Sequence, residues 1–226
     1  MPRTLLRLAA PAFGAALACL AAPASAQSVY AGVGSTGLTL GYAHTYSAML
    51  GARAEATALP SMARTYTKDG IDYGGDVSSR RVAALFDWHP MSGVFRLSAG
   101  LSAGNSSGQF FGAPSSGGSI TIGTTTVSYG PGDRYDTKVE YPTAMPYVGL
   151  GFGHTPARGW GFHADLGVLI GSPKVTGTLS PSLAAKISAA GGDPQAELDK
   201  ELATIRETTD KMVGLPVLSL GVSYRW

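Results

Sequence analysis

The chain has 226 residues, of which 31 are glycine, 44% are hydrophobic and 14% are charged. Soluble helical domains carry more charge and less glycine. No run of about 18 apolar residues follows residue 26, which excludes a bundle of membrane helices. The single cysteine, Cys19, excludes a disulfide scaffold and a cysteine-based zinc site. The formal net charge of +2 provides no strong basic field, so nucleic acid is not an expected partner.

The first 26 residues have the pattern of a secretory signal peptide. Arg3 and Arg7 precede an apolar run over residues 8–22, and Ala24-Ser25-Ala26 is a typical cleavage site. A lipoprotein that begins at Cys19 is the alternative, but the usual leucine three residues upstream is missing. We expect export, cleavage after Ala26 and one mature domain over residues 27–226, with fifteen basic and fifteen acidic side chains.

Apolar and polar residues alternate with a period of two along most of the mature chain. In the last segment, Leu218, Leu220, Val222, Tyr224 and Trp226 share one face, while serine, glycine and arginine share the other. Such alternation predicts β-strands with one apolar face. The same pattern predicts strands over residues 28–46, 49–64, 72–89, 94–107, 139–153, 159–172 and 213–226.

A soluble β-sandwich also alternates, but three features favour a membrane barrel. The polar faces are rich in glycine and serine, whereas the apolar faces carry almost no charge. Aromatic residues lie at strand ends, as an interfacial girdle would; the main candidates are Trp88, Phe95, Phe152 and Trp160. Short connections alternate with long ones, which is typical of outer-membrane barrels.

The segment 28–46 contains a plausible tight turn at residues 34–37, and splitting it there gives eight strands. We therefore predict an all-β fold, an eight-stranded antiparallel transmembrane β-barrel with long extracellular loops. Side chains fill the lumen of such a barrel, so a broad pore is not expected.

Charged residues on the inward faces must pair, because an unpaired buried charge is costly. The sequence predicts a lumen ion-pair network that locks the barrel; a gate or ion path is the alternative. Its expected members are Arg53, Glu55, Arg81, Asp87, His89, Arg96, His163, Asp165 and Arg225. All but Arg81 lie close to a short turn or to the C-terminus, which predicts one shared level in the periplasmic half of the lumen.

Several segments resemble a family of small, largely uncharacterised outer-membrane proteins of Gram-negative bacteria, the OmpA/OmpW-like eight-stranded barrels. These segments are LFDWHP, VFRLSAGL, PYVGLGFG, WGFHADLGVLIGSPKV and LSLGVSYRW. The resemblance implies an outer-membrane location and outer-membrane lipid as a partner, and it brings no established activity.

The C-terminus also resembles the signal that the barrel assembly machinery reads, with Leu218, Leu220, Val222, Tyr224 and Trp226 on one face. Recognition of such a signal would add the strand to an open sheet edge.

The connections have predicted structure of their own. Residues 119–122 and 125–128 flank Gly123 and predict a small hairpin, and residues 65–75 predict a shorter turn with its tip at 68–70. Asp193 before Pro194 predicts a helix start, and residues 182–190 predict another turn or two of helix.

No chemistry stands out. His44, His89, His154 and His163 are scattered, and no cluster has the spacing of metal ligands, so we expect no metal, no cofactor and no catalytic residue. We predict a non-enzymatic barrel with an envelope-structural role or a role in surface recognition or adhesion, whose loops present a possible extracellular ligand site. The alternatives are a narrow channel for small or hydrophobic solutes and a lipid-modifying enzyme.

Overall fold

The computed structural model describes residues 27–68, 71–90, 92–114, 117–130, 132–153, 158–210 and 214–226. The predicted signal peptide, the turn tip at residues 69–70 and His154 lie outside these residues. Among the described helices, none is long and apolar enough to cross a membrane.

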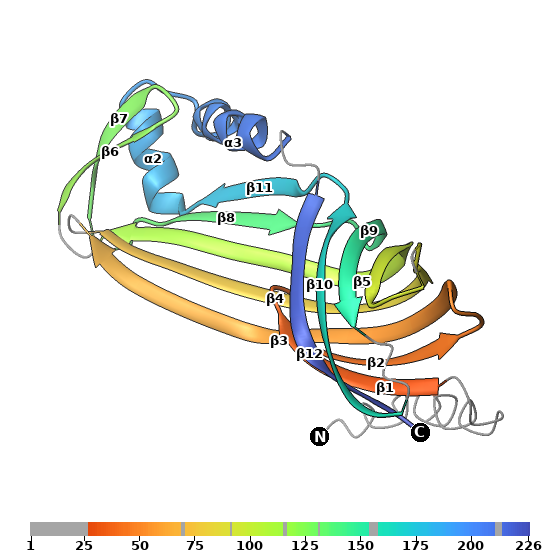
Figure 1. Cartoon of the computed structure of the whole chain (residues 1–226). Coiled ribbons are helices and arrows are strands. Elements are labelled where there is room, and N and C mark those ends of the chain that lie inside the picture. The colour runs from red at the N-terminus through yellow and green to blue at the C-terminus, as the bar shows by residue number, and fades with distance from the viewer. Residues whose placement is uncertain are drawn as a thin grey trace, which may run out of the picture.

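Eight of the described strands close into an antiparallel ring (Figure 1). In order around it they are β1 (Gln27–Gly34), β2 (Gly37–Thr45), β3 (Leu50–Lys68), β4 (Ile71–Trp88), β5 (Phe95–Pro114), β9 (Ala144–Gly153), β10 (Gly159–Ile170) and β12 (Gly214–Arg225). The ring closes because β12 pairs with both β1 and β10, while β5 pairs with β9. The predicted all-β fold is confirmed, as is the split of segment 28–46 into two strands.

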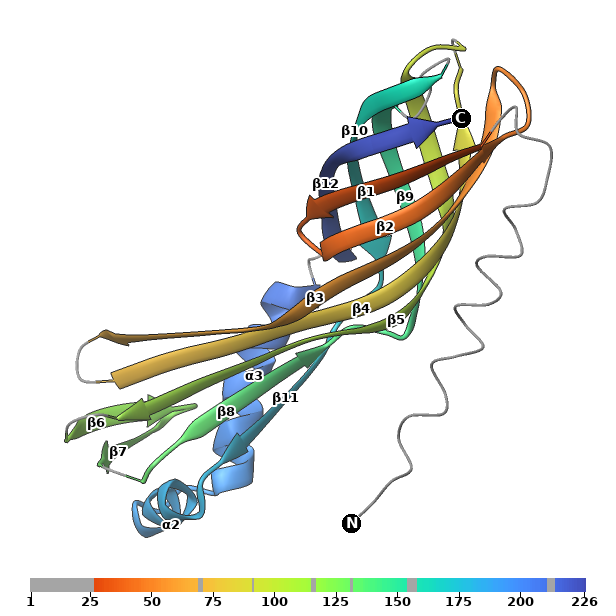
Figure 2. The same cartoon turned by 90° about the horizontal axis from the view of Figure 1, so that it is seen from below.

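Three strands extend far beyond the ring. Strands β3, β4 and β5 have 19, 18 and 20 residues, whereas a membrane-spanning strand needs only about 9–11. Their far halves join β8 (Tyr135–Glu140) and β11 (Lys174–Leu179) in a sheet that projects from one end of the ring (Figure 2). We call this sheet the arm, the end of the ring that carries it the distal end, and the opposite end, where the C-terminus lies, the terminal end.

The arm corrects three predicted boundaries. Residues 65–68 and 71–75, predicted as a turn, continue β3 and β4, and residues 108–114 continue β5. The predicted strand 139–153 is two strands, because β8 ends at Glu140 and β9 begins at Ala144. Pro142 lies in the break, and its missing N–H cannot contribute to a continuous ladder.

Two helices and a hairpin pack against the arm. The hairpin of β6 (Gly118–Ile122) and β7 (Thr125–Tyr129) has the predicted position, and its apolar side chains contact α2 (Pro181–Ala189). Helix α3 (Pro194–Asp210) begins where predicted, since the Asp193 carboxylate accepts the N–H groups of Gln195 and Ala196. Leu198 and Leu202 of α3 are buried against Val175 of β11, so the helices cover the arm and leave the ring wall free.

Candidate functional site

The outer surface of the ring is strongly apolar. Trp160, Phe162 and Leu220 are 75%, 83% and 58% exposed, and their neighbours on the same face are also apolar. Further exposed apolar side chains of this face are Val33, Leu38, Leu40, Val82, Phe86, Leu101, Val148, Leu150, Leu166, Leu218 and Val222. Soluble monomers rarely expose apolar surface this extensive, and such surfaces typically meet lipid or a protein partner.

The predicted aromatic girdle lies at the terminal end of the ring. Trp88, Phe152 and Trp160 are exposed, and Phe95 is half-buried. The ring of Phe95 meets that of Phe152 edge-on at a centroid distance of 5.4 Å, and Trp160 meets Tyr224 in the same way at 5.2 Å. The side chains of Leu218, Leu220, Val222 and Tyr224 belong to the same outer face, with Trp226 just after β12.

The interior of the ring near the terminal end holds two arginines between carboxylates. Arg53 Nε lies 2.8 Å from an Asp87 oxygen, and Arg53 Nη2 lies 3.4 Å from Asp165 Oδ1. Arg96 is fully buried, with its Nη2 2.5 Å from the same Asp165 oxygen and its Nε 3.8 Å from Asp87. Glu55 completes the group, with Oε2 3.8 Å from Arg53 Nη1. These five side chains come from β3, β4, β5 and β10, so they tie together strands that lie across the lumen from one another.

Two hydroxyl side chains that sequence reasoning missed complete this network. Ser98 donates to Asp87 at 2.6 Å and accepts from Arg53 at 3.2 Å, and Tyr30 donates to Glu55 at 2.8 Å. Both lie on inward faces of their strands, so the alternation that identified Arg53 and Asp87 could have identified them as well.

The other predicted members of the network have different surroundings. Arg81 is buried farther toward the distal end, where it donates to Ser102 and to the backbone carbonyls of Gly104, Pro142 and Thr143. His89 shares a hydrogen bond with the Gly93 carbonyl in the turn between β4 and β5.

The remaining two lie near the terminal end. The ring of His163 packs edge-on against Tyr30, and Arg225 is half-buried at the end of β12. No ion pair of Arg81 or His89 with an acidic side chain is found among the described residues.

Inward glycines make room for these large side chains. A Cβ on Gly151 would collide with the Arg96 guanidinium, and one on Gly41 would overlap the Tyr30 ring. A Cβ on Gly149 or Gly167 would run into the Tyr147 hydroxyl. The glycine-rich inward faces thus complement bulky groups from the neighbouring strands and leave little empty space.

The middle of the lumen departs from the expectation of a polar interior. Leu85, Met145, Tyr147 and Leu169 form a buried apolar cluster there, which we call the plug. Leu85 lies two positions distal to Asp87 on β4, and Leu169 lies four positions distal to Asp165 on β10. The lumen therefore holds an ionic layer and an apolar layer next to it. A narrow cavity of about 10 Å³ lies beside both and is lined in part by Thr36, Thr39, Thr57 and Ser219.

A carboxylate fastens the hairpin to α3 on the arm. Glu197 accepts the Thr124 N–H at 2.5 Å, its hydroxyl at 3.0 Å and the Lys200 ammonium at 2.7 Å. The hydrogen bond from Lys200, followed by that from the Thr124 N–H, lowers the pKa of Glu197 from 4.5 to about 2. The contact should therefore hold above pH 4.5 and be lost only as the pH falls through about 2.

This pH dependence can be followed on the Thr124 amide by NMR. We expect its chemical shift to titrate with a midpoint near 2, and Glu197→Ala, which removes the accepting oxygen, should release the amide at neutral pH. Asp199→Asn, on the exposed side of α3, should leave the Thr124 signal unchanged. A midpoint near the ordinary glutamate value of about 4.3 would show that the contact does not form.

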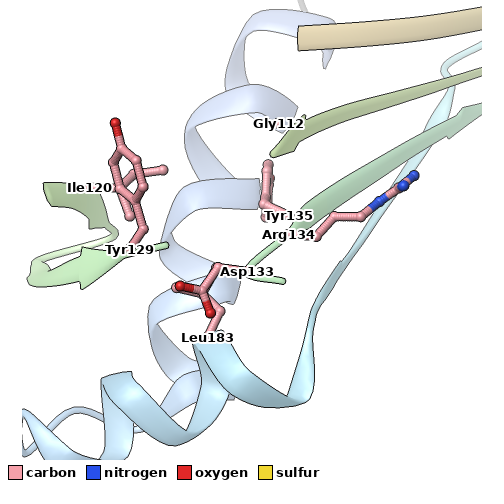
Figure 3. Close-up of a pocket in the computed structure, with 7 residues that line it drawn as sticks. All are labelled: Gly112, Ile120, Tyr129, Asp133, Arg134, Tyr135 and Leu183. Carbon is pink, nitrogen blue, oxygen red and sulfur yellow. The ribbon is translucent and has the colours of Figure 1, made fainter. Parts of the chain in front are cut away.

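A small cavity lies between the hairpin, residues 133–135 and α2 (Figure 3). Its volume is about 20 Å³, which suffices for one water molecule. Asp133 lines it, but one carboxylate oxygen already accepts from Gly130 at 2.8 Å and from Lys186 at 2.5 Å. The Arg134 guanidinium points away from it (Figure 3) and pairs with Asp136, so the cavity belongs to the packing of α2.

No group of histidine, cysteine, aspartate and glutamate suited to a metal ion occurs among the described residues. The prominent chemistry of the interior is ion pairing. The arrangement can lock strands together and close the lumen.

Comparison with known proteins gives a fold but no family. No protein-family model and no curated protein matches the chain. The solved structures that match include CarO2 and CarO of Acinetobacter baumannii. CarO2 has a TM-score of 0.68 at 19% identity, over 89% of this chain and 98% of its own. CarO has a TM-score of 0.57 at 17% identity, over 90% and 98%. At these identities the likeness shows the shared fold alone.

Proposed function

We propose that this chain is a non-enzymatic outer-membrane β-barrel of a Gram-negative cell envelope, with a closed lumen and an arm held at the cell surface. The observation that supports this most is one ring whose outer face is apolar while its interior is filled by the ionic layer and the plug. Lipid around the ring would cover its apolar outer face. The filled interior favours a closed lumen over a channel.

The orientation follows from the lengths of the connections. The connections from β2 to β3, β4 to β5 and β9 to β10 lie at the terminal end with the C-terminus, and this end would face the periplasm. The arm would face outward, together with the two-residue turn between β1 and β2. The C-terminal residues Leu218 to Trp226 would be the segment that the assembly machinery captures. The arm and its helices would serve recognition, since outer loops are the part of such a barrel that meets other molecules.

Conductance in planar bilayers tests the closed lumen. We expect the refolded barrel to show no stable unitary currents, because the ionic layer and the plug occupy the lumen and the cavity beside them has a volume of only about 10 Å³. Replacing plug residues together, as in Leu85→Ala with Tyr147→Ala and Leu169→Ala, should produce brief openings. Stable currents from the unmodified protein would contradict the closed lumen and favour a channel for small solutes.

Deletion of residues 181–210 tests the division between the ring and its surface elements. The helices α2 and α3 contact β11, β7 and each other, so the deletion should leave membrane insertion intact. Deletion of residues 218–226, which removes part of the ring wall, should abolish insertion. If the first deletion also blocked insertion, the helices would be needed to build the barrel.

A further inference from the structure

A cup opens at the distal mouth of the ring, on the inner side of the arm. Its volume is about 310 Å³, which lies at the lower end of the range for small-molecule sites. Its wall includes Leu59, Val77, Ser79, Ser106, Phe110 and Leu215. These residues come from β3, β4, β5 and β12, so rigid strands form the cup.

One aromatic ring lies flat on the wall of the cup. A Cβ on Gly75 or on Gly108 would come within 2.9 Å of the Phe110 ring. Gly75 pairs with Phe110 across the two strands, and Gly108 lies two positions before Phe110 on β5. One face of the Phe110 aromatic ring therefore packs against the two glycines, and the Phe110 side chain remains 46% exposed. The other face of the ring is free to stack on a ligand.

The bottom of the cup is closed. Tyr141 and Leu215 line the cup and also pack against the plug. Below the level of Ser79, the Arg81 guanidinium directs its hydrogen bonds to Ser102 and to backbone carbonyls. A molecule that enters the cup meets no onward path and no free donor from Arg81, so the cup is a site for binding.

The wall carries hydroxyl groups but no formal charge. The Ser79 and Ser106 hydroxyls bond each other at 2.8 Å, and the Ser35 hydroxyl at the rim donates to the Pro216 carbonyl and accepts from Leu218. An ionised ligand would lose its hydration here without gaining a counter-charge. A flat, uncharged ring would gain stacking and apolar contact at little polar cost.

We propose that the cup binds a small, uncharged aromatic molecule, which stacks on Phe110 above the plug. The proposal rests on the closed lumen proposed above, since the plug forms the floor. It also gives the arm a specific task, which is to hold one wall of a ligand site clear of the membrane.

Benzyl alcohol is a suitable probe, with the refolded protein in lipid nanodiscs and empty nanodiscs as the blank. We expect saturable binding in saturation-transfer NMR, weakened at least about tenfold by Phe110→Ala, a loss of about 1.4 kcal/mol. The matched control is Phe111→Ala, because Phe111 lies over Gly74 on the neighbouring position and stacks with Arg134 at 4.3 Å. The Phe111→Ala variant should bind benzyl alcohol as tightly as the unmodified protein does. Val77→Phe, which fills the cup without removing the platform, should also abolish binding.

Charge provides the second arm of the test. Benzoate and benzylammonium carry the same ring and should each bind at least about tenfold more weakly than benzyl alcohol. Absence of saturable binding, equal binding by Phe110→Ala, or tighter binding of either ion would overturn the proposal. If binding depends on Phe110 but the bilayers show stable currents, the cup is a binding site and the closed lumen is refuted. If the bilayers show no currents and no binding occurs, only the proposal for the cup is refuted.

Discussion

Replacing Arg96 by alanine should lower the free energy of unfolding by about 3–5 kcal/mol, because the buried carboxylates lose one of their two cationic partners. Arg96 is fully buried and contacts both Asp87 and Asp165. Its loss leaves Arg53 as the remaining cation among three carboxylates in this group. Urea unfolding of the vesicle-inserted protein, followed by tryptophan fluorescence, measures the change.

Two variants make this prediction specific. Asp165→Asn removes one of the three negative charges and keeps the shape of the side chain, so it should cost clearly less than Arg96→Ala. Lys138→Ala breaks the exposed ion pair with Glu140 and should cost no more than about 1 kcal/mol. An unfolding midpoint that Arg96→Ala leaves unmoved would mean that the ionic layer does not hold the ring together.

Replacing Leu220 by arginine should destabilise the inserted barrel by about 2–4 kcal/mol, the cost of an arginine on the lipid face near the bilayer midplane. Leu220 lies in the middle of β12, paired with Val33 and Ala164, and its side chain is 58% exposed. In a soluble protein the same substitution at such an exposed position would cost almost nothing.

The control for Leu220→Arg is Thr178→Arg on β11. Thr178 also lies on a strand, but it belongs to the arm, beyond the apolar band of the ring. Its substitution should change the unfolding free energy by less than about 0.5 kcal/mol. Equal small effects at both positions would show that water touches the two surfaces alike.

The alternation of residue types was sufficient to predict the strands and their faces. A period of two assigns every second side chain to one side of the sheet. The structure accordingly has Arg53, Asp87 and Asp165 on the inner side, and on the outer side Leu218, Leu220, Val222 and Tyr224. The helix start at Asp193 and the hairpin around Gly123 also followed from local signals.

What could not be predicted depends on which residues lie opposite each other across strands. The fit of Tyr30 over Gly41, or of Arg96 over Gly151, requires the register of neighbouring strands. Arg81 looks like an ion-pair member on its own strand, yet the break at Pro142 brings carbonyl groups to it instead.

The arm was missed for a similar reason. Alternation continues along β3, β4 and β5 where they leave the ring, so the pattern cannot tell a strand against lipid from one that stands beyond it. The length of each strand, and the point at which the partner of β5 changes from β9 to β8, decide where the ring ends and the arm begins.

A single gel tests directly whether the apolar outer face of the ring lies in lipid. After refolding into phospholipid vesicles, the mature protein should migrate differently before and after boiling, because a lipid-embedded closed sheet resists detergent until heated. A mature chain that stays monomeric and dissolved in buffer free of lipid and detergent, with one migration position in both lanes, would contradict the account.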